Sequence, residues 1–288
     1  MERPAAKAAG GAVDLHLHST CSDGWLGPAE LADAARRAGL AGLALTDHDT
    51  LAGLPAAAAA ATAAGLFFVR GLELTCELGG AEVHLLGYGL DPAHPPLLAA
   101  LAEEAEIRKQ RAQAILERLA RMGVHLELGE LRPDSGPIGR PHIAAALVQR
   151  GVCKDLRVAF ERYLSRGGAA YVSRRRRALA AAIALLHQSG AYTVLAHPGS
   201  ALGPESLLAL KRMGLDGVEV AHPRHRLDTE RLLRRLAAKF ELIATAGSDF
   251  HGLPGQELGR PSAPFETAEL LAAGRPSCSL HPAAQHQS

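Results

Sequence analysis

Histidines and carboxylates recur at short spacings along this chain. The first such segment reads DLHLHSTCSDG, in which His16 and His18 are separated by one residue and Asp23 follows shortly after. Residues i and i+2 of a β-strand point to the same face, so the two imidazoles are expected to project side by side. Imidazoles placed in this way can share a divalent transition metal, and a carboxylate in the following turn can reach the same ion. A pair of incidental histidines in a buried strand is the alternative.

A second segment, T-D-H-D, directly follows the apolar run GLAL at residues 42–45. Three ionisable groups at the end of a buried strand would be costly without partners, which predicts a metal or a salt-bridge network. Asp49 could instead cap the next helix, but that role would not explain His48. Further residues of the same types occur in the segments GLE, EVHLLG, LAHP and AGSDFHG, and they are Glu73, His84, His197, Asp249 and His251. Taken singly, Glu73 and His84 are equally well explained as a strand-end glutamate and a core histidine.

These residues lie mostly where a predicted strand ends and a loop begins. In parallel barrels, functional sites collect at the face formed by the carboxyl ends of the strands. Six histidines and three carboxylates would meet there, too many for one zinc ion with three protein ligands. The number suits two or three divalent ions bridged by a carboxylate. Such ions bind a phosphoryl group and generate hydroxide near neutral pH, so we expect a metal-bound hydroxide and no protein nucleophile.

Short apolar runs alternate with helix-like segments and account for the positions of these side chains. Strands are predicted at residues 13–18, 42–49, 66–75, 81–89, 192–198, 216–223 and 241–249, and helices at 28–39, 50–64, 204–213 and 228–239. Strands separated by helices predict parallel pairing in a wound sheet or barrel. The middle of the chain differs, because 96–121, 141–151 and 155–167 all have helical patterns. We therefore predict a barrel from 12–95 and 177–275, a helical cap inserted at 96–176, and a loosely ordered tail at 276–288.

Composition excludes several classes of protein. With 288 residues, 48% of them hydrophobic and 21% charged, the chain can bury a large core, and global disorder is excluded. A net charge of +1 provides no global field for binding long duplex nucleic acid. No secretory signal is visible, and the uncharged stretch 51–69 is interrupted by Pro55 and Gly65, which favours a helix and a strand over a membrane span. The four scattered cysteines favour reduced thiols in a cytoplasmic protein; they are Cys21, Cys76, Cys153 and Cys278.

The order of the motifs H-x-H, S-D-G, T-D-H-D, G-x-E, a histidine within a strand, H-P and G-S-D-x-H-G resembles the PHP (polymerase and histidinol phosphatase) superfamily, over about residues 12–100 and 178–265. The resemblance implies a distorted (β/α)7 barrel and a site for three ions. It implies one ion held by His16, His18, Glu73 and Asp249, a second by Glu73, His84 and His197, and a third by Asp23, His48 and His251. Glu73 would therefore bridge the first and the second ion. Mixed imidazole and carboxylate ligands admit Mn, Fe or Zn, and we expect Mn.

Three residues are candidates for contacts with the substrate. Gly139 to Ala144, with the sequence GRPHIA, resembles the branch that contains 3′,5′-nucleoside bisphosphate phosphatases and 5′→3′ exonucleases of short RNAs. Arg140 precedes Pro141, which can begin a helix, and a helix N-terminus with a guanidinium forms an anion site; a solvated loop arginine is the alternative. His225, which follows a strand, could line the substrate pocket or lie in a surface loop. Arg174 begins a run of four arginines, which is either a solvated charge run or a phosphate contact.

The combined expectation is a metal-dependent phosphoesterase. It would hydrolyse the 3′-phosphate of nucleoside 3′,5′-bisphosphates, or it would act on short 5′-phosphorylated oligoribonucleotides. A histidinol-phosphate-type phosphatase would use the same motifs without the helical cap. A non-catalytic, metal-stabilised module that binds nucleic acid or regulates a partner is the alternative outside enzymes, and the intact ligand motifs argue against it. The sequence makes no prediction of the oligomeric state.

Overall fold

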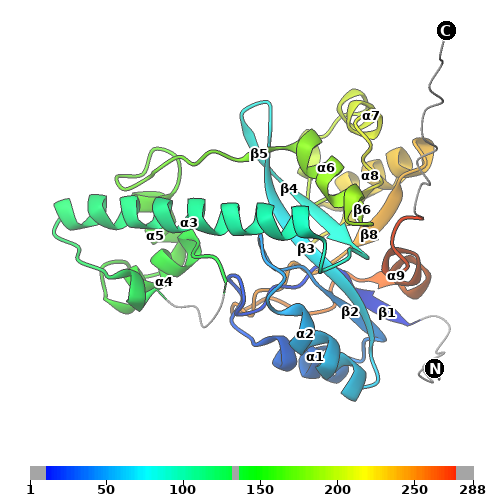
Figure 1. Cartoon of the computed structure of the whole chain (residues 1–288), viewed down its shortest axis with the longest axis horizontal. Helices are drawn as coiled ribbons and strands as arrows, with labels where there is room; N and C mark the ends of the chain where they lie inside the picture. The colour runs from blue at the N-terminus through cyan, green and yellow to red at the C-terminus, as the bar shows by residue number, and fades with distance from the viewer. Residues whose placement is uncertain (1–10, 132–135, 277–288) are drawn as a thin grey trace, which may run out of the picture.

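The computed structural model describes residues 11–131 and 136–276 and contains a strongly curved sheet. Its main strands are β1 (Ala12–Asp14), β2 (Gly42–Leu45), β3 (Phe67–Leu78), β4 (Ala81–Tyr88), β6 (Tyr192–Leu195), β7 (Gly217–Ala221) and β8 (Ile243–Ala246). They are ordered β8-β7-β6-β4-β3-β2-β1, and β9 (Ala263–Pro264) pairs with β1 (Figure 1). Beyond the two ends of this order, Leu17 and Phe250 form a parallel bridge. The sheet is therefore a nearly closed barrel, as predicted.

The close approach of the chain after β8 to the chain after β1 requires a glycine. A Cβ atom on Gly247 would lie 2.3 Å from the Cβ atom of His16, a distance that two carbon atoms do not tolerate. The barrel is thus brought together by a residue without a side chain next to a predicted metal ligand. Gly247 belongs to the same G-S-D-x-H-G motif that carries Asp249 and His251.

Among the main strands, β4 runs against the others and distorts the barrel, and the short strand β9 is also antiparallel to β1. β4 is antiparallel to both β3 and β6, whereas the β1–β2, β2–β3, β6–β7 and β7–β8 pairs are parallel. The prediction of parallel pairing applies to strands that a helix separates, and no helix separates β3 from β4. Gly79 and Gly80 both have positive φ and form a tight turn between them, which suits glycine. The reversal pairs His84 with Thr75, so His84 comes from the middle of its strand rather than its end.

The first strand is shorter than predicted, since β1 ends at Asp14 and not at His18. The backbone beyond Asp14 bonds to side chains and loops instead of a continuous ladder. The backbone N–H of Leu17 donates to Thr46 Oγ1 at 3.1 Å, and Tyr88 Oη donates to the carbonyl of Leu15 at 2.7 Å. His16 and His18 consequently lie on an extended segment that is held by the surrounding side chains.

Helices surround the barrel. They are α1 (Pro28–Arg37), α2 (Leu54–Ala63), α6 (Leu179–Gln188), α7 (Pro204–Arg212), α8 (Leu227–Lys239) and α9 (Phe265–Ala272). Proline occupies the first turn of α1, α2 and α7, where its missing N–H costs nothing. The helices α6 and α9 were not predicted from the sequence, and α9 packs Ala268 and Leu271 against the barrel core formed by Val13, Leu86 and Tyr88. No described helix is both long and apolar enough to span a membrane.

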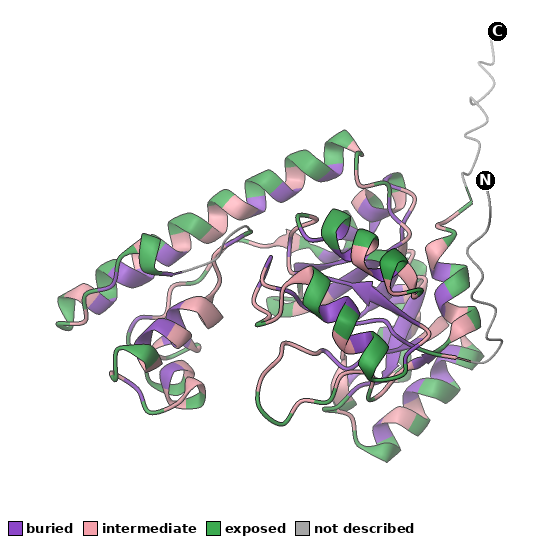
Figure 2. Cartoon of the chain, turned by 90° about the horizontal axis from the view of Figure 1, so that it is seen from below, coloured by how far each residue is buried: buried purple, intermediate pink, exposed green. Residues whose placement is uncertain are grey.

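A second group of helices lies to one side of the barrel (Figure 1). It comprises α3 (Pro95–Arg121), η1 (Leu128–Glu130), α4 (Arg140–Gln149), α5 (Leu156–Ala159) and a π-helical turn, η2 (Phe160–Leu164). We call this group the helical insertion. It has an apolar cluster of its own, in which Ile115, Leu119, Ile143, Leu147 and Leu164 are buried. Figure 2 shows buried positions along these helices. The chain returns to the barrel through β5 (Arg177–Ala178), which pairs with β3. The exact division of the chain into domains stays a prediction, and the predicted tail falls largely outside the described residues.

Candidate metal centre

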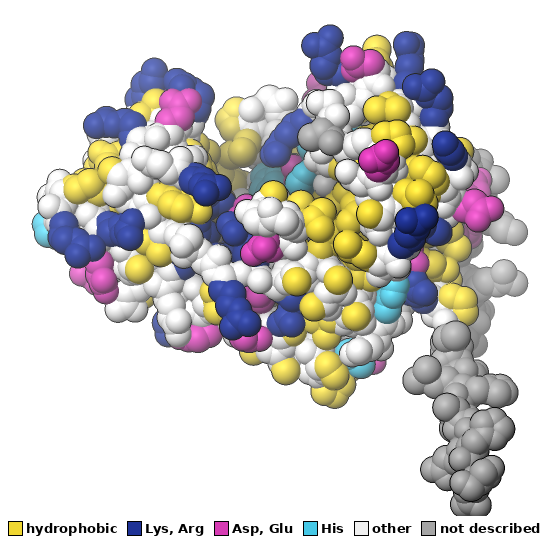
Figure 3. All heavy atoms as spheres, turned by 90° about the horizontal axis from the view of Figure 1, so that it is seen from above, with side chains coloured by type: hydrophobic (Ala, Val, Ile, Leu, Met, Phe, Trp, Pro, Cys, Tyr) yellow, Lys and Arg dark blue, Asp and Glu magenta, His cyan; other side chains and the backbone are white. Residues whose placement is uncertain are grey.

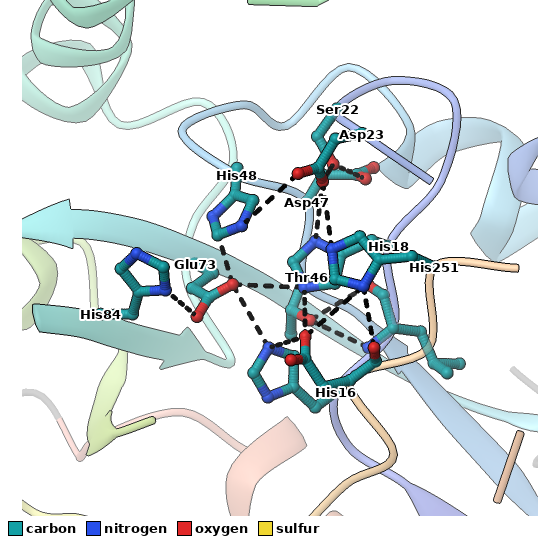
Figure 4. Close-up of polar contacts among 12 residues, drawn as sticks. His16, His18, Ser22, Asp23, Thr46, Asp47, His48, Glu73, His84 and His251 are labelled. Atoms are coloured by element: carbon teal, nitrogen blue, oxygen red, sulfur yellow. Dashed lines mark hydrogen bonds and ion pairs between the residues drawn. The ribbon is translucent and has the colours of Figure 1, made fainter. Parts of the chain in front are cut away.

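The nine predicted ligands lie close together, and Figure 4 labels seven of them, all but His197 and Asp249. His16 and His18 follow β1, Asp23 lies in the next turn, and His48 follows β2, while Glu73 and His84 lie within β3 and β4. His197 follows β6, and Asp249 and His251 follow β8. Three groups have ligand atoms within 4.8 Å of one another: His18, Asp23, His48 and His251; His16, His18, Glu73 and Asp249; and His48, Glu73 and His84. These groups resemble the implied ligand sets, although the assignment of each residue to an ion stays a prediction.

Glu73 is the centre of this cluster and is fully buried. Its Oε2 atom lies 3.3 Å from His16 Nε2, 3.2 Å from His18 Nε2 and 3.2 Å from His48 Nδ1. Its Oε1 atom lies 2.9 Å from His84 Nδ1 and 3.1 Å from His197 Nε2. Burial alone would raise the pKa of this carboxyl, but the surrounding imidazoles, His48 and His84 first, hold it well below its usual range. One carboxylate therefore contacts histidines of all three groups.

The buried polar atoms of the cluster indicate whether its residues suit a bound cation. Nine buried side-chain nitrogen and oxygen atoms of the described residues have no hydrogen-bond partner, and six of them belong to this cluster. They are His16 Nε2, both ring nitrogens of His18, His48 Nδ1, Glu73 Oε2 and His84 Nδ1. Leaving such atoms unsatisfied is costly, and a divalent cation would be their common partner. Imidazole nitrogen with carboxylate oxygen is a donor set for a transition metal. The residues present thus fit divalent metal ions.

The charges of the cluster act on its histidines in opposite directions. Burial would lower the pKa of the His18 imidazole, but the nearby carboxylates of Asp249 and Glu73 raise it to about 10. In the same way Glu73 outweighs burial at His84 and raises its pKa to about 9. At His48 burial dominates and lowers the pKa to about 3. Without a cation, the cluster therefore carries protons on some of its histidines at neutral pH.

Backbone strain coincides with this cluster. Asp49, His197 and Asp249 have φ values of 52°, 28° and 50°, in the left-handed region that residues other than glycine seldom adopt. Strained backbone persists where the surrounding structure holds it, typically at functional sites. The strain at His197 and Asp249 directs two predicted ligands towards the centre of the cluster.

Three carboxylates outside the nine predicted ligands support the cluster. Glu219 Oε1 lies 3.0 Å from His16 Nδ1, and its Oε2 accepts from the backbone N–H of His197 at 2.8 Å. Asp14 and Asp47 are also buried: Asp14 accepts from the Ser248 backbone at 3.0 Å, and Asp47 from the Ser19 backbone at 2.7 Å. The sequence feature that could have identified Glu219 is an acidic residue within an otherwise apolar strand, the run GVEVA of β7.

A pocket of about 500 Å³ opens onto the cluster. One wall comes from the barrel loops and the other from the helical insertion, and Figure 3 shows histidine at the floor of the hollow between them. Glu73, His84, Asp249 and other cluster residues line it. Six arginines line the same pocket: Arg108, Arg111, Arg140, Arg157, Arg174 and Arg224. A pocket with this lining attracts an anion that carries several negative charges.

The predicted phosphate contacts differ in their surroundings. Arg140 begins α4, as expected, and its Nη2 lies 3.3 Å from Glu82 Oε1 at the edge of the pocket. Arg174 is almost fully buried, and it pairs with Glu104 Oε2 at 3.1 Å and Asp49 Oδ2 at 3.4 Å.

His225 is absent from the residues that line the pocket. Its Nδ1 bonds to the carbonyl of Val220 at 2.9 Å and its Nε2 accepts from the Gly199 backbone at 3.1 Å. The expected substrate contact through His225 therefore finds no support, because the backbone occupies both ring nitrogens.

Three of the four arginines at residues 174–177 form ion pairs, whereas Arg175 is exposed. Arg176 contacts Glu82 on β4, with Nε donating to Oε2 at 2.8 Å. Arg177 Nη2 lies 3.3 Å from Glu103 Oε2 on α3. Together with the contact between Arg174 and Glu104, these pairs tie the end of the helical insertion to α3 and to the barrel. The run thus positions the insertion beside the pocket.

Known proteins resemble this chain in sequence and fold. Residues 14–107 match the PHP domain family. The chain is 39% identical over 264 residues to a 3′,5′-nucleoside bisphosphate phosphatase of Chromobacterium violaceum, covering 86% of this chain and 90% of the relative. It is 36% identical to the 5′-3′ exoribonuclease Rnm of Escherichia coli, covering 86% and 88%. A solved structure from Bifidobacterium adolescentis, described as a candidate metal-dependent phosphoesterase, matches with a TM-score of 0.86 and 31% identity over 92% of this chain and 97% of that one. The chain therefore belongs to the PHP family of metal-dependent phosphoesterases.

Proposed function

We propose that this enzyme hydrolyses a phosphate ester of a nucleotide, which is either the 3′-phosphate of nucleoside 3′,5′-bisphosphates or a phosphodiester of short 5′-phosphorylated oligoribonucleotides. The observation that carries the proposal is the pocket, where six arginines stand beside the nine clustered ligands. A substrate with one phosphate needs only the cluster, whereas a second phosphate needs cationic side chains at a distance from it. The activities named for the phosphatase and exoribonuclease relatives agree with such a substrate.

We further propose that the cluster holds three divalent ions, with Mn as the physiological metal. The ligand sets are those implied by the resemblance, with Glu73 as the shared carboxylate. Ions bound there would supply an activated water and would neutralise the charge of the phosphoryl group. The contacts of Glu73 with five imidazoles support this arrangement.

The side chains of the pocket have two tasks in this proposal. Arg140 binds the phosphate that is not cleaved, because its planar guanidinium can donate two parallel hydrogen bonds to phosphate oxygens. Arg108 is held by Asp49 through Nε at 2.8 Å and by Thr75 Oγ1 at 3.0 Å, so it contributes positive charge from a fixed position. No cysteine is proposed as a nucleophile. Cys76 is fully buried, and burial raises its pKa, which disfavours the reactive thiolate.

Phosphate release from a substrate panel tests the proposal. The panel contains adenosine 3′,5′-bisphosphate, a short 5′-phosphorylated RNA, adenosine 5′-monophosphate and histidinol phosphate, each with Mn²⁺ and with a chelator. We expect the first two substrates to be hydrolysed with the highest kcat/KM, and chelation to abolish turnover. Preferential hydrolysis of histidinol phosphate would favour the rival phosphatase, and hydrolysis that survives complete removal of metal would contradict the role of the cluster.

A further inference from the structure

The mouth of the pocket carries a large exposed aromatic side chain that the proposed function has not used. Trp25 is 58% exposed, although it lines the same pocket as Asp23, His48 and His251. It is the single tryptophan of a chain in which aromatic residues make up only 4%. No aromatic ring or cationic side chain is stacked on its indole within the described residues. An unstacked indole at the entrance of a binding pocket is a surface on which a planar ligand can lie.

The backbone fixes the position of this indole. The N–H of Trp25 donates to the carbonyl of His251 at 2.8 Å, and the N–H of Thr20 donates to the carbonyl of Leu26 at 2.9 Å. On the facing loop, a Cβ atom on Gly252 would lie 3.1 Å from the Cβ atom of Trp25. Trp25 therefore stands on a braced turn between two predicted ligands, Asp23 and His251, and its ring needs no rearrangement of the loop to meet a substrate.

The facing loop is braced as well. Gln256 Oε1 accepts from the backbone N–H groups of His251 at 2.9 Å and Leu253 at 3.1 Å. Leu253 and Gln256 line the pocket with Trp25, so an apolar and aromatic wall adjoins the cluster. The wall formed by the helical insertion differs, because its aromatic residue, Phe160, already has the guanidinium carbon of Arg140 6.0 Å from its ring centroid. The free aromatic face of Trp25 therefore lies on the barrel side of the pocket. Arg140, which is paired with Phe160, lies on the insertion side.

We propose that Trp25 is the base-stacking residue of the pocket, which places the nucleobase against the barrel loops while the second phosphate faces Arg140. This inference rests on the proposed function, because it takes the substrate to be a nucleotide. Stacking on an aromatic ring tolerates every base, since each base has a π-face. The expected specificity is therefore for the presence of a base, with purines favoured over pyrimidines by their larger rings, rather than for one base sequence.

Two substrates that differ only in the base provide the kinetic test. They are adenosine 3′,5′-bisphosphate and its baseless analogue, 1-deoxyribose 3,5-bisphosphate, hydrolysed with Mn²⁺ by wild type, Trp25→Ala and Trp25→Phe. We expect Trp25→Ala to lower kcat/KM for the nucleotide by about 5- to 150-fold, the scale of losing one base–aromatic stack. The baseless analogue should be hydrolysed equally well by all three proteins. Trp25→Phe should restore most of the loss because it keeps an aromatic face.

Fluorescence supplies an independent readout, since the chain contains one tryptophan. Adenosine 5′-monophosphate should quench the emission of wild-type protein, and ribose 5-phosphate at the same concentration should not. Equal kinetic losses on both substrates, with a loss of bound metal, would make Trp25 a structural residue of the Asp23 turn and would overturn the inference. Unchanged kinetics in Trp25→Ala would also overturn it and would leave the exposed indole to a macromolecular partner.

The failure of the proposed function gives a different result. Wild-type protein that hydrolyses histidinol phosphate but neither bisphosphate would contradict the proposed nucleotide substrate itself. The fluorescence titration still decides the inference in that case, because quenching by the nucleotide alone supports base stacking at Trp25 and its absence contradicts it.

Discussion

Glu219 Oε1 lies 3.0 Å from Nδ1 of His16, and both side chains are fully or almost fully buried. Because Nδ1 faces this carboxylate, Nε2 is the ring nitrogen of His16 that lies towards Glu73 and Asp249, at 3.3 Å and 3.4 Å. The same Glu219 holds the backbone of His197 through its second oxygen. A carboxylate that orients a histidine in this way fixes its tautomer and raises its basicity towards a metal.

We expect Glu219→Ala to weaken metal binding by about 10- to 100-fold, the usual effect of removing such a supporting carboxylate. Glu219→Gln should lose less, because its amide oxygen can still accept from His16 Nδ1. The measurement is metal content after dialysis against graded concentrations of a chelator. An Ala variant that folds and keeps wild-type affinity would show that His16 does not depend on this contact.

The central position of Glu73 leads to a second prediction. Removing a shared carboxylate should release more than one ion, so Glu73→Ala should lose both metal and activity. Elemental analysis of wild type should find two or three transition ions per chain. Glu77→Ala is the matched control, because Glu77 lies on the same strand but is exposed. A wild-type protein that is folded and well loaded with only one ion would contradict the multinuclear site.

The raised pKa values of two histidines predict the pH dependence of metal binding. In the metal-free protein, His18 with a pKa of about 10 and His84 with a pKa of about 9 are protonated at pH 7. A protonated ring nitrogen cannot ligate, so these protons must leave when a cation binds. Apparent affinity should therefore increase as the pH rises from 7 towards 9. Calorimetry in buffers of different ionisation enthalpy measures the protons released, and binding without proton release would show that both rings are neutral beforehand.

The location of the site was predictable because its chemistry is concentrated at strand ends. Each apolar run ends in a short polar motif, as at His48 and Asp249, and a closed parallel sheet must bring these ends together. The side-by-side placement of His16 and His18 could be predicted from the two-residue repeat of an extended chain alone. The alternation of strands and helices predicted the barrel for the same local reason.

The supporting contacts were less predictable because they depend on tertiary neighbours. Glu219 and Asp14 are isolated acids in buried strands, and only the fold shows that they face His16 and Ser248. Arg108 lies on an amphipathic helix, where a charged residue is normally taken as solvated, yet it pairs with Asp49. The Gly79–Gly80 turn makes β4 antiparallel to β3, and the resulting position of His84 depends on the register of the β3–β4 pair.

Arg140 allows the two-phosphate proposal to be tested at a single side chain. It occupies the first turn of α4, where a helix N-terminus adds positive potential, and its guanidinium reaches the pocket. Arg140→Ala should cost about 1.5–3 kcal/mol, the scale of a hydrogen bond to a charged group. The loss should appear in kcat/KM for adenosine 3′,5′-bisphosphate and not for an aryl phosphate, which cannot reach Arg140 while its phosphate is at the cluster.

Arg150→Ala is the matched control for this substitution, because Arg150 ends the same helix and pairs with Glu130 on the surface. It removes the same charge from α4 and should leave both substrates unaffected. Arg140→Lys adds a second comparison, since a lysine keeps the charge without the planar pair of donors and should recover only part of the loss. Equal losses on both substrates in Arg140→Ala would place Arg140 at the phosphate that is cleaved, or in the support of Glu82 beside His84. The second phosphate would then have to be bound by other arginines of the pocket.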